Sequence, residues 1–131
     1  MKRVVAAIIL NNNGQILVCQ RTRHQPMPLK WEFPGGKIEP GEQPREALRR
    51  ELQEELGVSA QIGDEVETVQ YHYKNGGAVE LHFFRVAEFD GEMEKHIFEQ
   101  IRWVEPRSLT RFDFLDADRE IVRKIAAGDV L

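Results

Sequence analysis

The sequence lacks the features that mark secreted, membrane or nucleic-acid-binding proteins. Its single cysteine, Cys19, cannot form an internal disulfide, which is typical of a reducing compartment. The apolar run at 4–10 is too short to cross a bilayer and no small-residue cleavage site follows it, so we expect a core strand in a cytoplasmic protein without a membrane partner. The net charge of −4 leaves no general basic excess, which argues against binding a nucleic acid polymer.

The chain also has no internal repeat, no low-complexity tract and no long linker. With 131 residues, of which 41% are hydrophobic, it is long enough to bury a core without a structural metal. We therefore expect one domain that spans residues 1–131.

Hydrophobic patterning predicts mostly strands, interrupted by one helix and closed by another. The turn signals Asn12-Asn13-Gly14 and Asn75-Gly76-Gly77 each predict a β-hairpin between the strands that flank them. The expected strands are 3–10, 15–21, 31–33, 65–73, 78–89 and 101–104, and the expected helices are 44–56 and 118–127. This order predicts an α/β fold with a mixed central sheet flanked by helices on both faces.

The expected helix at 44–56 carries three glutamates on one side. Glu51, Glu54 and Glu55 fall within about a 100° sector of its surface, at the edge of the face that packs on the sheet. Like charges at this spacing repel each other, and a hard divalent cation with oxygen ligands would offset the repulsion. Taken alone, however, such a helix is more often a solvated acidic surface.

The surrounding residues favour the catalytic interpretation. The segment 36–58 resembles the full signature of the Nudix hydrolases, with no departure at any fixed position. It reads Gly36, five residues, Glu42, seven residues, and then Arg50-Glu51-Leu52-x-Glu54-Glu55-x-Gly57-Val58. The resemblance covers essentially the whole chain and implies the α/β/α sandwich of that family. It further implies that water attacks a phosphorus atom of a nucleoside diphosphate linked to another group.

The resemblance also implies roles for individual residues. Glu51, Glu54 and Glu55 would ligate Mg²⁺ or Mn²⁺, together with the carbonyl group of Gly36. Two further signature residues, Glu42 and Arg50, would support the geometry of the loop and helix.

The general base is left open between two glutamates. Glu51 can serve in this family, and so can a glutamate outside the signature. Glu99, which lies four residues before Trp103 and near the start of a strand, is the outside candidate for base and metal ligand. Its alternative interpretation is a solvated turn residue.

The segment Trp31–Glu39 resembles the MutT-like branch of the family, the 8-oxo-dGTP diphosphatases that sanitise the nucleotide pool and so support DNA repair. Arg21 matches an arginine that contacts phosphates in MutT, although a charge at a strand end is the alternative. Arg23 and Lys37 could add positive charge for the distal phosphates. Phe33 and other aromatic residues could stack on a base, or could simply belong to the core.

Asp118 is the candidate for base recognition, and here the chain departs from MutT, which has an asparagine at the aligned position. An amide offers a donor and an acceptor, whereas an ionised carboxylate only accepts. Asp118 would therefore suit the amino groups of guanine or cytosine, and a cytidine triphosphate competes with 8-oxo-dGTP as the substrate. Alternatively, Asp118 only caps the final helix.

We therefore expect a Mg²⁺-dependent nucleoside triphosphate diphosphatase that releases a monophosphate and pyrophosphate. Oxidised nucleotides such as 8-oxo-dGTP are the leading substrates, and CTP, 5-hydroxy-dCTP or another diphosphate such as ADP-ribose are the alternatives. A nucleotide-binding regulatory module without activity is the non-enzymatic alternative. The partner would be this small molecule, and the chain would be a monomer or a weak homodimer.

Overall fold

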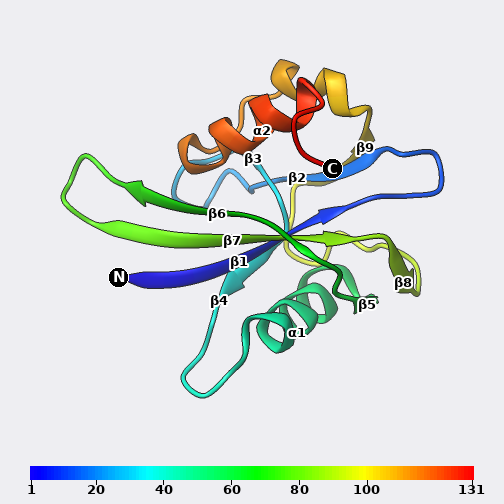
Figure 1. Ribbon diagram of the computed structural model, residues 1–131, viewed down its shortest axis with the longest axis horizontal. Coiled ribbons are helices and arrows are strands. Elements are labelled where there is room, and N and C mark those ends of the chain that lie inside the picture. The colour runs from blue at the N-terminus through cyan, green and yellow to red at the C-terminus, as the bar shows by residue number, and fades with distance from the viewer.

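The computed structural model describes residues 1–131, and its secondary structure has two α-helices on opposite sides of a sheet (Figure 1). In chain order the elements are β1 (Lys2–Ile9), β2 (Ile16–Gln20), β3 (Trp31–Glu32), β4 (Gly35–Lys37), α1 (Pro44–Leu56), β5 (Ser59–Gln61), β6 (Glu65–His72), β7 (Ala78–Val86), β8 (Glu88–Asp90), β9 (Gln100–Val104), the 3₁₀ helices η1 (Pro106–Arg111) and η2 (Asp116–Asp118), and α2 (Arg119–Ala126). None of these helices has the length and apolar character needed to cross a membrane.

The central sheet has four strands in the order β4-β1-β7-β6. Strands β1 and β7 are parallel, while β4 and β6 run antiparallel to their neighbours, so the sheet is mixed. Smaller sheets, β3-β2-β9 and β5-β8, complete the β-structure. The predicted mixed sheet flanked by helices is confirmed.

The hairpin predicted between 3–10 and 15–21 is wrong. Only an isolated bridge between Leu10 and Ile16 joins β1 to β2, and the two strands lie in different sheets. The physical reason is that β4 and β7 already occupy both edges of β1, so β2 has no free edge to pair with. The turn itself forms, because the Asn11 side chain accepts hydrogen bonds from the backbone N–H groups of Asn13 and Gln15.

The other predicted hairpin is present, with a shorter second strand than expected. Strands β6 and β7 pair from His72 opposite Ala78 onward. The chain then leaves the central sheet at Ala87, and β8 pairs with β5 rather than continuing β7. Neither β5 nor β4 was predicted, since both are only three residues long and β4 has two glycines.

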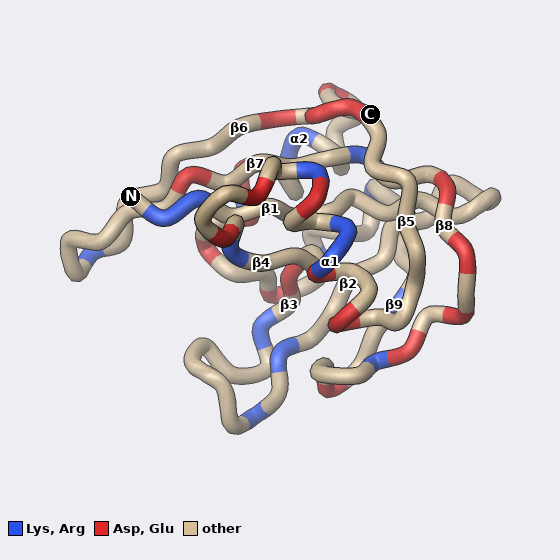
Figure 2. The backbone as a smooth tube through the Cα atoms, turned by 90° about the horizontal axis from the view of Figure 1, so that it is seen from below, with Lys and Arg blue, Asp and Glu red and all other residues tan.

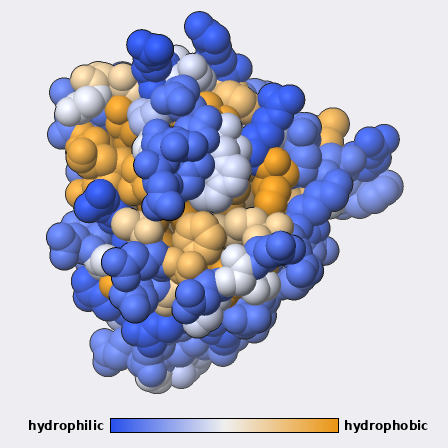
Figure 3. Space-filling view, turned by 90° about the vertical axis from the view of Figure 1, so that its right-hand side faces the viewer, coloured by the Kyte–Doolittle hydropathy of each residue, from blue (hydrophilic) through white to orange (hydrophobic).

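Each α-helix covers one face of the central sheet and closes its own core. On one face α1 buries Ala47, Leu48, Leu52 and Leu56 against alternate residues of β1. On the other face α2 buries Ile121, Val122 and Ile125 near Phe83 and Phe114. The apolar atoms that reach the surface in Figure 3 form separate patches among hydrophilic ones.

The bounds of α1 follow from its sequence. Pro44 occupies the first turn, where its missing N–H costs nothing, and the side chains and backbone of Gln43 and Glu46 form a capping box. Gly57 ends the helix with a φ of 71°, a left-handed conformation that glycine adopts without strain. These signals fix which turns of α1 face β4, and so determine where the glutamates lie.

Candidate active site

Strand β4 places two glycines directly against the acidic side of α1. A Cβ atom on Gly36 would lie 2.5 Å from the carboxyl carbon of Glu51. The Gly35 N–H donates a hydrogen bond of 3.3 Å to Oε1 of Glu55. Because β4 pairs with β1, opposite Val5 and Ala6, the glycine backbone is held rigidly at this distance from the helix. Glu51 and Glu55, two of the three predicted metal ligands on α1, therefore lie against the backbone of β4.

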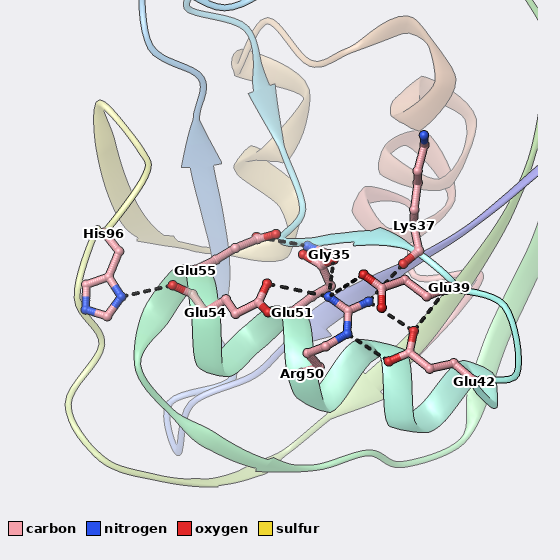
Figure 4. A network of polar contacts seen from close by, with 9 residues as sticks. All are labelled: Gly35, Lys37, Glu39, Glu42, Arg50, Glu51, Glu54, Glu55 and His96. Carbon is pink, nitrogen blue, oxygen red and sulfur yellow. Dashed lines mark hydrogen bonds and ion pairs between the residues drawn. The ribbon is translucent and has the colours of Figure 1, made fainter.

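Arg50 lies beside Glu51 on α1, between Glu51 and Glu42 (Figure 4). Its guanidinium donates to both carboxyl oxygens of Glu42, at 2.8 and 3.0 Å, and to Oε1 of Glu51 at 2.9 Å. It also donates to the carbonyl oxygen of Lys37 at 3.1 Å. The hydrogen bond from Arg50, followed by that from the Glu39 N–H, lowers the pKa of Glu42 to about 2. These contacts join the loop before α1 to β4, the supporting role expected for Glu42 and Arg50.

Glu55 is the buried residue among the three glutamates of α1, Glu51, Glu54 and Glu55, and only 7% of it is exposed. Burial raises the pKa of its carboxyl well above the usual range, and a hydrogen bond with Glu51 and the negative charge of Glu51 add to the effect. A buried acid beside a second carboxyl group is electrostatically unfavourable unless a proton or a cation lies between them.

Glu54 directly precedes Glu55 on α1, and its side chain is directed to the solvent-exposed surface. Its side chain is 60% exposed, and one oxygen lies 3.5 Å from Arg50. Its backbone carbonyl contacts the imidazole Nδ1 of His96 at 3.0 Å, which ties the loop before β9 to the end of α1. Glu54 thus does not join Glu51 and Glu55 here, and no three His, Cys, Asp or Glu side chains are arranged to hold a metal ion.

The donor set nevertheless fits a hard divalent cation. The paired Glu51 and Glu55 offer carboxyl oxygens, and the absence of a side chain at Gly36 leaves its backbone open toward Glu51. Oxygen donors of this kind are those that Mg²⁺ and Mn²⁺ prefer. The residues that could hold such an ion are Glu51, Glu55, the Gly36 carbonyl and, from the exposed neighbouring position, Glu54.

A cavity of about 320 Å³ begins at this cluster. Gly36 and Glu55 line one part of its wall, and Asp118, from the opposite layer of the fold, lines another. Arg21 and Phe33, both predicted to bind substrate, also line it. The cavity therefore brings the predicted metal-binding segment together with the predicted base-recognition residue.

Asp118 stands at the N-cap position of α2, yet its side chain makes no capping hydrogen bond. The side chain is buried and accepts a hydrogen bond from the backbone N–H of Phe33 instead. Burial raises the pKa of the Asp118 carboxyl to about 8, and the nearby charge of Glu32 contributes in the same direction. At neutral pH Asp118 is therefore largely a neutral acid that faces the cavity. The capping alternative for this side chain is wrong.

Glu32 is the charged residue of the cavity wall that was not predicted from the sequence. Its carboxyl oxygens lie 3.2 and 3.3 Å from Nη1 of Arg21, and both side chains are more than four-fifths buried. Burial raises the pKa of Glu32, and Arg21 opposes that shift. A charged residue between the two buried aromatic residues of Trp31-Glu32-Phe33 was the signal that could have revealed it.

Three other predicted residues lie outside the cavity wall. Arg23 and Glu99 pair with each other at 3.4 Å, and Arg23 is 65% exposed. Lys37 lines an adjoining groove of about 520 Å³, and its side chain points away from the Arg50 network in Figure 4. In Figure 2 the loop between β2 and β3, which carries Arg23, has basic positions and no acidic ones. The roles of Arg23, Lys37 and Glu99 stay predictions.

Comparison with protein families gives a match to the NUDIX domain over residues 1–125. Among curated proteins, the chain is 37% identical to a CTP pyrophosphohydrolase of Escherichia coli, over 97% of this chain and 93% of that protein. It is 35% identical to an 8-oxo-dGTP diphosphatase of Haemophilus influenzae, over 94% of this chain and 90% of the relative.

Solved structures show the same likeness. The solution structure of the E. coli ORF135 protein superposes with a TM-score of 0.86, at 37% sequence identity, and covers 97% of this chain and 89% of that one. A study of MutT from Aliivibrio salmonicida and Vibrio cholerae supplies a structure with a TM-score of 0.78 at 30% identity, covering 97% and 98% of the two chains. Sequence and fold therefore point to the same family.

Proposed function

The chain belongs to the Nudix hydrolase family, and from this premise we propose that it hydrolyses nucleoside triphosphates to a monophosphate and pyrophosphate, with 8-oxo-dGTP as the leading substrate. The observation that carries the proposal is the single cavity that reaches from Gly36 and Glu55 to Asp118. A nucleotide has a charged phosphate chain at one end and a flat, hydrogen-bonding base at the other. The two parts of the cavity wall offer matching chemistry.

At the phosphate end, Glu51, Glu54, Glu55 and the Gly36 carbonyl would hold Mg²⁺, with Mn²⁺ as a substitute. When bound, such an ion neutralises phosphate charge and lowers the pKa of an attacking water. Glu51, whose Oε1 accepts a hydrogen bond of 2.9 Å from Arg50, would accept the proton of that water as the general base. Glu99, held by Arg23, is the second candidate for this base.

At the base end of the cavity, the protonation state of Asp118 determines which hydrogen-bonding groups of the base it can recognise. A neutral carboxyl group presents one donor and one acceptor, as the side-chain amide of asparagine does. Because burial keeps Asp118 largely protonated near neutral pH, it can pair with the same edge of an oxidised guanine that an amide would pair with. On this proposal, the aspartic acid at position 118 would present the same hydrogen-bonding pattern as the asparagine of MutT.

A cytidine triphosphate is the second candidate. The relative named CTP pyrophosphohydrolase is 37% identical to the chain, against 35% for the Haemophilus influenzae relative named 8-oxo-dGTP diphosphatase. An Asp118 carboxyl group can also accept a hydrogen bond from the exocyclic amine of cytosine. We further propose that the substrate is a free nucleotide and that the protein acts as a monomer or a weak homodimer.

Steady-state kinetics with Mg²⁺ on 8-oxo-dGTP, dGTP, CTP, 5-hydroxy-dCTP and ADP-ribose test the proposal. We expect the highest kcat/KM for 8-oxo-dGTP. Equal kcat/KM for 8-oxo-dGTP and dGTP would remove the role in sanitising oxidised guanine, and preference for the cytidine nucleotides would establish the second candidate. Glu54→Gln should abolish pyrophosphate release without unfolding the protein. Unchanged turnover in that variant would refute the metal site. If the wild type itself shows no turnover, the non-enzymatic regulatory module is favoured.

A further inference from the structure

Three of the four large apolar side chains that are exposed away from the chain termini line the cavity or the groove beside it. Apart from the terminal residues Met1 and Leu131, only Met27, Leu29, Tyr73 and Ile97 belong to this class, with exposures from 39% to 47%. Tyr73 and Ile97 line the cavity, and Tyr73 and Met27 line the adjoining groove. They come from three separate segments: the loop between β2 and β3, the turn after β6 and the loop before β9.

The backbone at Met27 is strained. Its φ of 52° is left-handed, which is unfavourable for a bulky L-residue, and the following Pro28 disfavours that conformation further. The loop is nonetheless held from both sides, because Arg21 Nε donates to the Pro26 carbonyl at 2.9 Å and Gln20 Nε2 donates to the Leu29 carbonyl at 3.1 Å. Strain that is maintained in this way is typical of ligand-binding segments.

Tyr73 is the aromatic ring that a ligand can reach. Phe33, Phe83 and Phe114 are at most 4% exposed, and Phe33 packs on the other two at centroid distances of 6.2 and 5.2 Å. Tyr71 packs edge-on against Tyr73 at 5.1 Å and so supports its ring from the side. Stacking requires an accessible ring face, and the three buried phenylalanines offer none.

We propose that Met27, Tyr73 and Ile97 form an apolar clamp that grips the faces of the substrate's base at the cavity mouth. This inference rests on the proposed function and adds the residues that supply affinity for the base. The base fits this surface because its ring faces are apolar and polarisable. Tyr73 and Ile97 line the same cavity as Asp118, and Met27 adjoins them through the groove that it shares with Tyr73. Asp118 then reads the hydrogen-bonding edge, and the clamp binds the faces of any base.

The test compares single alanine variants of the three clamp residues with Leu29→Ala. Leu29 is a matched control, since it lies in the same loop as Met27, has a similar exposure and φ, and lines neither the cavity nor the groove. Titration calorimetry measures the binding of 8-oxo-dGMP, CMP and pyrophosphate, of which only pyrophosphate has no base. This readout does not depend on turnover, so a wild type that binds the monophosphates but hydrolyses no triphosphate would refute the proposed function and leave the clamp standing.

We expect each clamp variant to weaken the binding of both monophosphates, by roughly 10-fold for Tyr73→Ala, and to leave pyrophosphate binding unchanged. Leu29→Ala should match the wild type with all three ligands. The clamp is refuted if its variants behave as Leu29→Ala does, or if monophosphate and pyrophosphate binding weaken in parallel. Sedimentation velocity tests whether a second copy of the chain covers this apolar surface instead. If the wild type is a dimer and Met27→Ala and Ile97→Ala are monomers, a second copy covers the surface and the proposal is refuted.

Discussion

The Glu51 carboxyl group lies so close to the backbone of Gly36 that a single added methyl group at Gly36 would come within 2.5 Å of its carboxyl carbon. The two residues come from α1 and β4, elements that meet because β4 pairs with β1 and α1 packs on the same sheet. The space that the Glu51 carboxyl group occupies is thus left free by the absence of a side chain on a neighbouring strand.

Gly36→Ala should therefore lose activity while keeping its fold. The Glu51 side chain can swing away from the new methyl group, which relieves the overlap at little cost in stability but displaces the carboxylate. A displacement of about 1 Å at a reacting centre commonly lowers the rate about 100-fold. We expect a loss of that order in kcat, with a small change in the free energy of unfolding by urea.

Gly35→Ala provides the contrast. Its added methyl group would overlap the backbone carbonyl of Val5, which cannot move without breaking the pairing of β1 with β4. This variant should be destabilised by about 3 kcal/mol. If Gly36→Ala is destabilised as strongly as Gly35→Ala, or stays fully active, the interpretation of the Glu51–Gly36 contact is wrong.

Arg50→Lys tests the network that holds Glu51. A lysine keeps the positive charge but cannot bind both oxygens of Glu42 and reach Glu51 at the same time. We expect kcat to fall by roughly 10-fold or more and the free energy of unfolding by about 1–2 kcal/mol. Arg49→Lys is the control, because Arg49 is exposed and forms no ion pair. Equal kinetics for the two variants would mean that Arg50 acts only as a charge.

The site and the fold differ in how far local sequence determines them. The helix Pro44–Leu56 was predicted at its observed bounds because a first-turn proline and a C-terminal glycine mark its ends. The position of Glu51 on that helix follows directly. Its contact with Gly36 was not derivable from these local signals, because two adjacent glycines carry no hydrophobic period and β4 forms only by pairing with β1.

The same limit applies to partners that are distant in sequence. The turn at Asn11 and Gly14 forms as expected, but whether the flanking strands pair depends on which other strands occupy the edges of β1. Likewise Glu32, in β3, and Asp118, at the start of α2, become buried in one cavity only when these distant segments come together in the folded chain. Turn chemistry is local, whereas strand partners and the pKa of a cavity carboxyl group are not.

Divalent cations should stabilise the protein through Glu51 and Glu55. A ligand at 100 times its Kd adds about 2.7 kcal/mol to the free energy of unfolding, which raises the Tm of a chain of this size by several degrees. Differential scanning fluorimetry with increasing MgCl₂ should show this rise for the wild type and not for Glu51→Gln or Glu55→Gln. Glu92→Gln, a change at an exposed glutamate in the loop before β9, should behave as the wild type. An equal rise in all four proteins would place the cation elsewhere.

Asp118→Asn should change how stability depends on pH. The Asp118 carboxyl has its pKa raised from an ordinary 3.8 to about 8 in the folded protein, so the unfolded chain releases its proton at a lower pH than the folded chain does. The stabilising contribution of Asp118 is therefore complete below pH 4 and is lost as the pH rises toward 8. An asparagine does not titrate, so the variant should gain stability over the wild type across this window, by an amount on the order of a few kcal/mol.

Urea denaturation of both proteins between pH 4 and pH 9 measures this difference directly. The gap between their unfolding free energies should widen with pH and level off above pH 8, where Asp118 is ionised in both states. Activity should follow the same proton, because the wild type loses its donor toward 8-oxo-dGTP as the pH passes 8 while the asparagine variant retains it. A gap of constant size from pH 4 to pH 9 would mean that Asp118 is already ionised in the folded protein, and base recognition would then favour the amine of cytosine over oxidised guanine.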